Sequence, residues 1–283
     1  MNELCILISF LLLLCKIIKM EIKKVYSIYF SATYTTRKVV REIALHMGAI
    51  IYEYDITAQS IENKIEFNKG DVLVIGVPVY GGRIPKSTLL SINKLVGNNT
   101  PAIITCVYGN RDYDDALLEL RNEVEAIGFK VVSAGAFIAR HSIFSQIAKD
   151  RPNTEDMKDV CQFAICSKSI IESLEDFDTL MQIDIKGNIP YKVFNQLPIY
   201  PLGNESCIDC GVCVSKCPVG AIPSDNPKTT NEEKCLACGR CIVECLQDAR
   251  DFRGEFFDAH ATRFLEAFSS PKENEKYYAE INN

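Results

Sequence analysis

The sequence predicts an α/β fold, a doubly wound and mainly parallel sheet with helices on both faces, followed by a small cysteine-rich α+β domain. Strand-like and helix-like segments alternate from residue 25 to residue 178, which is the pattern of βαβ units. Several strand segments are continuous apolar runs, as expected of strands buried on both faces. Eight of the 13 cysteines lie between Cys207 and Cys245, so this part of the chain has its own chemistry.

The individual elements follow from residue type and spacing. We expect strands at residues 25–30, 50–56, 71–77, 102–107 and 129–137. We expect helices at residues 37–47, 85–96, 112–127 and 154–178, and a further amphipathic helix at 256–268. Because ligands of such sheets bind beyond the carboxyl ends of the strands, the loops after the strands are the candidate site.

The chain of 283 residues carries a net charge of −6, so no basic surface indicates nucleic-acid binding. We divide the chain into residues 1–20 (a hydrophobic leader or a mis-assigned start), 21–178 (the α/β domain), 179–205 (a linker), 206–250 (the cysteine domain) and 251–283 (a C-terminal helical tail). The linker assignment depends on its Gly and Pro content.

The apolar run at residues 4–18 is short for a membrane span, which needs about 20 residues. It also lacks the features of a secretory signal. Met20 offers an alternative start directly before the first strand. Lysines follow the run and would keep the rest of the chain in the cytoplasm if it inserted. We therefore expect a cytoplasmic protein and favour this over membrane association through residues 4–18.

The cysteine domain repeats one spacing. The first group is Cys207, Cys210, Cys213 and Cys217, followed by Pro218, and the second is Cys235, Cys238, Cys241 and Cys245, followed by Leu246. The spacing C-x₂-C-x₂-C-x₃-C-P binds 4Fe–4S clusters in bacterial proteins, and its fourth cysteine ligates the other cluster. We therefore assign Cys207, Cys210, Cys213 and Cys245 to cluster I, and Cys217, Cys235, Cys238 and Cys241 to cluster II.

Zinc is the alternative metal, because paired C-x₂-C motifs also form structural zinc sites. The duplicated spacing favours two clusters, and Gly211 and Gly239 would let the backbone turn around a bulky inorganic core. Residues 206–250 resemble the two-cluster bacterial ferredoxins at all eight ligand positions, and depart from them only at Leu246.

A hydroxyl-rich loop at residues 31–36 joins the first strand to the first helix. Its polar members are Ser31, Thr33, Tyr34, Thr35 and Thr36. Hydroxyls and backbone N–H groups at a helix N-terminus can bind phosphate, although such a loop can also simply cap the helix. The glycine motifs of dinucleotide and nucleoside-triphosphate sites do not occur here.

Two further loops place aromatic residues beside glycine at the same end of the sheet. They contain Pro78, Tyr80, Gly81 and Gly82 after the third strand, and Tyr108, Gly109 and Asn110 after the fourth. Such pairs let the backbone approach a flat ring closely. No catalytic acid, base or nucleophile stands out, and among the histidines His141 is the one we expect near this region.

Residues 25–175 are similar to flavodoxin-like domains. The resemblance implies FMN, with its phosphate on residues 31–36 and its ring between the Tyr80 and Tyr108 loops. Tyr34 stands where many such loops have glycine, and a positive φ would strain it there.

The whole arrangement resembles the flavodoxin/ferredoxin fusion family of bacteria and archaea. This implies electron transfer between an FMN site and two 4Fe–4S clusters, with redox partner proteins as donor and acceptor. The alternatives are a flavin-dependent reductase of a small substrate and a zinc-stabilised binding protein without redox chemistry.

Overall fold

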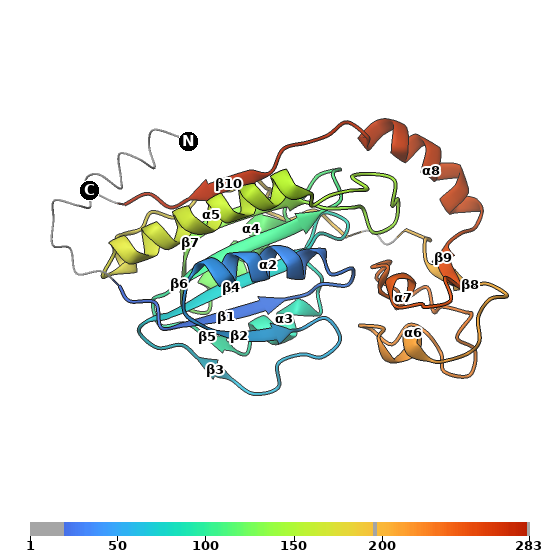
Figure 1. Ribbon diagram of the computed structural model, residues 1–283, viewed down its shortest axis with the longest axis horizontal. Coiled ribbons are helices and arrows are strands. Elements are labelled where there is room, and N and C mark those ends of the chain that lie inside the picture. The colour runs from blue at the N-terminus through green and yellow to red at the C-terminus, as the bar shows by residue number, and fades with distance from the viewer. Residues whose placement is uncertain (1–19, 195–196, 282–283) are drawn as a thin grey trace.

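The main sheet has six strands, and its parallel part confirms the expected α/β fold. The computed structural model describes residues 20–194 and 197–281. The strands lie in the order β10-β7-β6-β4-β1-β2 (Figure 1). Their bounds are β1 (Lys24–Tyr29), β2 (Ile50–Asp55), β4 (Asp71–Pro78), β6 (Thr100–Tyr108), β7 (Phe129–Ile138) and β10 (Glu275–Tyr278). The five parallel strands follow the flavodoxin-like order 2-1-3-4-5, with the switch point between β1 and β4.

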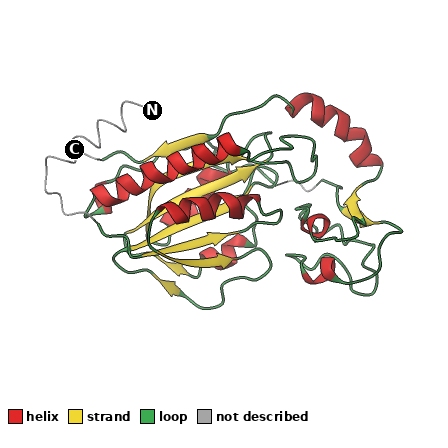
Figure 2. Ribbon diagram, viewed as in Figure 1, coloured by secondary structure: helices red, strands yellow, loops and turns green. Residues whose placement is uncertain are grey.

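Helices cover both faces of this sheet (Figure 2). The helices α2 (Thr35–His46) and α5 (Thr154–Ser173) pack on one face, and α3 (Thr88–Ile92) and α4 (Ala116–Glu125) belong to the core on the other. Gly76 in β4 allows α2 to lie close, since a Cβ at this position would collide with Val40 and lie 2.6 Å from Thr105 Oγ1. This close approach fixes the N-terminus of α2 at the carboxyl edge of the sheet.

The helix expected at residues 85–96 is wrong in extent. Helix α3 covers only Thr88–Ile92, and β5 (Leu95–Val96) pairs in parallel with β3 (Ile65–Glu66). The backbone N–H of Ile65 donates to Lys94 O at 2.9 Å. This pairing with a distant segment satisfies backbone groups that a longer helix would have used. Similarly, α5 ends at Ser173, and a 3₁₀ turn, η1 (Phe177–Thr179), follows it.

The C-terminal part leaves the α/β domain and then returns to it. The cluster domain contains β8 (Pro201–Gly203), α6 (Val212–Ser215), α7 (Arg240–Val243) and β9 (Arg250–Phe252), and β8 pairs with β9. It lies beyond the carboxyl ends of the parallel strands (Figure 1). After α8 (Glu255–Phe268), β10 pairs antiparallel with β7. The expectation of a helical tail at 251–283 is therefore wrong for β10, which completes the sheet.

The expected linker at 179–205 packs against the α/β domain. Arg121 donates to Ile183 O at 2.5 Å, and the Asp115 carboxylate accepts from the backbone N–H of Asn188 at 2.8 Å and of Lys192 at 2.5 Å. The leader and its apolar run lie outside the described residues. Within the described ranges, no helix has both the length and the apolar character that crossing a membrane requires.

Asn110 fastens the returning chain to the loop after β6. Its Nδ2 donates to Phe268 O at 2.7 Å and to Ser270 O at 2.9 Å. Its Oδ1 accepts from the backbone N–H of Lys272 at 3.2 Å. The side chain is buried, so these bonds are shielded from water. Asn110 therefore holds the segment between α8 and β10 in place.

We predict that Asn110→Asp lowers the free energy of unfolding by about 1–3 kcal/mol, the cost of leaving buried polar groups unpaired. The substitution keeps the shape of the side chain but turns an oxygen towards the two carbonyls. Thermal unfolding followed by circular dichroism measures the effect. Asn98→Asp, at an exposed position, is the matched control. Equal melting temperatures of the two variants would contradict this role of Asn110.

Candidate functional site

The four cysteines assigned to cluster II converge on one small cavity. Cys217, Cys235, Cys238 and Cys241 all line it, although Cys217 comes from the first group. Burial raises the pKa of Cys238 to about 12 and that of Cys241 to about 11, against the lowering effect of a backbone hydrogen bond on Cys238 and of Arg250 on Cys241. These thiols would stay protonated in water-free surroundings, and a bound metal centre would have to displace their protons.

The cysteines of the first group form a similar turn. Burial raises the pKa of Cys213, and Cys207 and Cys210 lie close enough to add a smaller rise. The fourth ligand proposed for cluster I, Cys245, follows α7, and its sulfur accepts from Ala249 N at 3.3 Å. The same bond recurs at Cys217, whose sulfur accepts from Ala221 N at 3.2 Å. The two groups therefore share one local architecture.

Glycine makes this repeated turn possible. Gly211 has φ 73° and Gly239 has φ 75°, and each precedes the short helix that carries the third cysteine. A positive φ is readily adopted by glycine, as the sequence suggested at these two positions. The helices α6 and α7 then carry the third cysteine of each group and lead to the fourth.

A zinc site would need its sulfur ligands close together. A Zn–S bond of about 2.3 Å keeps any two sulfur ligands within about 4.6 Å of each other. Among the residues that the structure describes, three ligand atoms come within 4.8 Å of one another only at Glu42, His46 and Cys161. In the described cluster domain, no three of these ligand atoms lie that close together.

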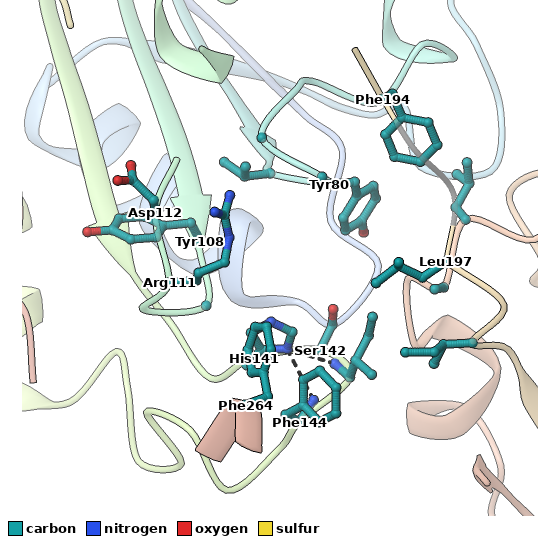
Figure 3. Close-up of a pocket in the computed structure, with 18 of the residues that line it drawn as sticks. Tyr80, Tyr108, Arg111, Asp112, His141, Ser142, Phe144, Phe194, Leu197 and Phe264 are labelled. Carbon is teal, nitrogen blue, oxygen red and sulfur yellow. Dashed lines mark hydrogen bonds between the residues drawn. The ribbon is translucent and has the colours of Figure 1, made fainter. Parts of the chain in front are cut away.

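A second cavity, of about 300 Å³, lies between the α/β domain and the cluster domain (Figure 3). The predicted Tyr80 and Tyr108 loops form one side, with Gly81, Gly82 and Gly109. Residues 235–237, which include the proposed cluster II ligand Cys235, form another wall. Burial, and then the charge of Cys238, raises the pKa of Tyr80 well above its usual value. The segment assigned to cluster II therefore lies directly beside this cavity.

Side chains from other parts of the chain pack closely against the glycines of the two aromatic loops. A Cβ at Gly81 would lie 2.8 Å from the Phe194 ring, and one at Gly109 would lie 2.6 Å from the His141 ring. The Gly82 position is similarly close to Asp114. Pro78 ends β4 and is not among the residues lining the cavity, and Asn110 turns its side chain to the tail.

His141 lines the cavity as a neutral base. Its Nδ1 accepts from the backbone N–H groups of Ile143 and Phe144, both at 3.1 Å. Burial, and then the charge of Arg111, lowers the pKa of His141 to about 4. At neutral pH the proton therefore resides on Nε2, which remains a hydrogen-bond donor.

Sequence reasoning missed several residues of the cavity. Lys192, Phe194 and Leu197 come from the expected linker, and Phe264 comes from α8. Their positions depend on how the linker and the tail pack over the sheet, which no local motif signals. Besides the residues of the Tyr80 and Tyr108 loops, His141 could be anticipated from its place after the last parallel strand.

The hydroxyl loop lies at the N-terminus of α2 and has hydrogen-bonding groups that no residue in the described ranges pairs. The N-cap residue Tyr34 has φ 67° and makes no side-chain cap bond. Ser31 Oγ accepts from Arg37 N at 3.0 Å, while Ser31 N donates to Thr57 Oγ1 at 2.8 Å. In the described part of the chain, the buried Thr36 Oγ1 has no hydrogen-bond partner. The first N–H groups of a helix also lack intrahelical acceptors, so this loop presents free donors.

Contacts with the cluster domain explain why a tyrosine occupies position 34, where many similar loops have glycine. Its backbone is in the left-handed region, as expected if the position requires a positive φ. Its ring packs under Arg240, with Cζ 4.6 Å from the ring centroid, and its hydroxyl donates to Glu244. Contacts with the cluster domain thus compensate the backbone strain, which is about 1–2 kcal/mol.

Comparison with protein families identifies the cluster domain. Residues 201–222 and 232–248 each match a model described as a 4Fe-4S binding domain. Ferredoxin-type segments of this kind imply redox partner proteins. None of the curated protein sequences compared with the chain matches it.

Solved structures similar to this chain include flavodoxins. Oxidised flavodoxin 1 from Bacillus cereus is 17% identical, with 52% of this chain and 97% of that chain covered and a TM-score of 0.41. A flavodoxin from the domain Archaea is 9% identical, with 52% and 98% covered and a TM-score of 0.37. Rubredoxin oxygen:oxidoreductase from the anaerobe Desulfovibrio gigas is 14% identical, with 54% and 37% covered and a TM-score of 0.39.

The strand order carries the fold assignment, and the two family matches carry the cluster assignment. The chain is a fusion of a flavodoxin-like α/β domain with a ferredoxin-like domain that contains two 4Fe–4S binding segments.

Proposed function

We propose that this protein is an electron carrier that transfers electrons between an FMN site in the α/β domain and two 4Fe–4S clusters. One observation carries the proposal: residues 235–237 of the cluster II segment form a wall of the cavity between the Tyr80 and Tyr108 loops. When bound, FMN would supply exchange of one or two electrons, and the clusters would exchange single electrons. The chain's own contribution is to hold these centres side by side.

The residues fit a flavin phosphate at the hydroxyl loop. Within the described residues Thr36 offers a buried hydroxyl without a partner, and the N-terminus of α2, whose N-cap Tyr34 makes no side-chain cap bond, offers backbone N–H groups. The helix dipole favours an anion at this end. Ser31, Thr33 and Thr35 add further hydroxyls, with Thr33 Oγ1 and Thr35 Oγ1 3.4 Å apart. We propose residues 31–36 as the phosphate site on these grounds.

The residues also fit a flat ring in the cavity. Tyr80, Tyr108 and Leu236 supply apolar and aromatic surface, and His141 supplies a donor at Nε2. A volume of about 300 Å³ is at the lower end for ligand cavities, so a flavin ring would leave little room for a separate substrate. This favours a carrier over a reductase with its own small substrate. Asn110 is not included, since its side chain holds the tail.

Cluster I is the more accessible of the two cluster sites. Cys210 is exposed, whereas Cys238 and Cys241 of cluster II are buried. Nearby apolar side chains are also open to solvent, with Ile208 64% exposed and Leu246 92% exposed. We propose that redox partner proteins exchange electrons at cluster I, while cluster II serves the flavin.

We predict that Cys217→Ala removes cluster II, because Cys217 joins the ligands of the second group. The variant should lose about half of its iron. The electron paramagnetic resonance spectrum of its remaining cluster should match that of Cys238→Ala and differ from that of Cys213→Ala. Cys161→Ala, outside the cluster domain, is the control and should keep all its iron. A Cys217→Ala spectrum that matches Cys213→Ala would contradict the crossed assignment.

We predict that Thr36→Val weakens FMN binding about tenfold, since it removes one hydrogen bond to a charged group. Quenching of flavin fluorescence during titration of the flavin-free, cluster-loaded protein measures the dissociation constant. Thr179→Val, at an exposed position, is the control and should bind FMN as tightly as the wild type. Unchanged affinity of Thr36→Val would exclude this hydroxyl from the phosphate site.

A further inference from the structure

The cluster II segment contacts both halves of the proposed flavin site. Residues 235–237 line the ring cavity. Three residues further on, Arg240 reaches the hydroxyl loop, which is not part of the cavity lining. Its Nη1 donates to Ser31 O at 3.3 Å and to Ala32 O at 3.2 Å. A single short segment therefore connects the two places where a flavin would be held.

Arg240 is built into this position. It is 7% exposed, and its Nε lies 3.2 Å from Glu244 Oε1 one turn further along the chain. The guanidinium stacks on the Tyr34 ring, and Glu244 accepts from the Tyr34 hydroxyl. Arg240 and Glu244 thus hold Tyr34 from two sides, and Tyr34 is the residue of the loop with φ 67°. The loop conformation depends on a side-chain pair that belongs to the cluster domain.

Cluster ligation in turn fixes this pair. Arg240 directly precedes Cys241 of cluster II, and Glu244 directly precedes Cys245 of cluster I. Gly239 packs against the loop as well, since a Cβ there would lie 3.5 Å from Thr33 Cγ2. Helix α7 is a single short turn, and such turns are marginal alone, so ligation of Cys241 and Cys245 would help to hold it in this orientation.

We propose that cluster loading and FMN binding stabilise each other through Arg240, which positions the phosphate loop. The inference rests on the proposed flavin site. Two carbonyls held by one guanidinium orient the loop. Because coupling between two binding sites is reciprocal, FMN must strengthen cluster retention by the same factor as the clusters strengthen FMN binding.

The test compares FMN affinity in cluster-loaded proteins under oxygen-free conditions, again by quenching of flavin fluorescence. Arg240→Gln should weaken FMN binding about tenfold, within the usual range of coupling between sites. Arg253→Gln is the matched control in the same domain, since Arg253 pairs with Asp251 instead of with the loop; it should bind as tightly as the wild type. Equal affinity of Arg240→Gln and wild type would overturn the coupling and leave the flavin site intact. A wild type that binds no FMN would overturn the proposed function as well.

A reciprocal measurement needs no variant that might fail to assemble. Iron release from the wild type to a chelator is followed with and without saturating FMN. We expect FMN to slow the release of the cluster II iron several-fold, and to have no such effect on Arg240→Gln where that variant carries clusters. Identical release rates with and without FMN in the wild type would contradict the proposal.

Discussion

The contact between the cluster II segment and the carboxyl edge of the sheet is the constraint on which the rest of the structure depends. The doubly wound sheet places its binding loops at that edge, and the chain brings Cys235, Cys238 and Arg240 against them. If the two domains were joined by a free linker, the cavity would lack one wall. Because the chain returns through α8 to add β10 to the sheet, the cluster domain is held at both ends.

This double attachment explains features that are unusual in isolation. Tyr34 adopts a backbone conformation that favours glycine, yet its ring and hydroxyl contact Arg240 and Glu244. Asn110, in a loop that could contact a ligand, instead binds the chain that leads to β10. Both residues use positions at the binding edge to hold the cluster domain. The flavodoxin-like part has thus adapted its loops to a permanent neighbour.

Much of this architecture could be predicted from the sequence, because it depends on local patterns. Buried strands such as β4 and β6 are continuous apolar runs. The cysteine spacing is also a local pattern, and it indicates cluster binding by itself. Strand β10 could not be predicted, since four residues pair with a strand formed about 140 positions earlier. The role of Arg240 was hidden for the same reason. Between two cysteines it resembles any surface arginine, until packing places it over Tyr34.

The proposed exchange of electrons between flavin and cluster II takes place within one molecule. It is tested most directly by reducing the flavin- and cluster-loaded protein with a short pulse of limiting reductant, without oxygen. Redistribution of electrons between the flavin and cluster absorption bands is then followed over time. Transfer within one molecule predicts a first-order rate that does not change with protein concentration. A rate that rises in proportion to protein concentration, or no redistribution, would contradict it.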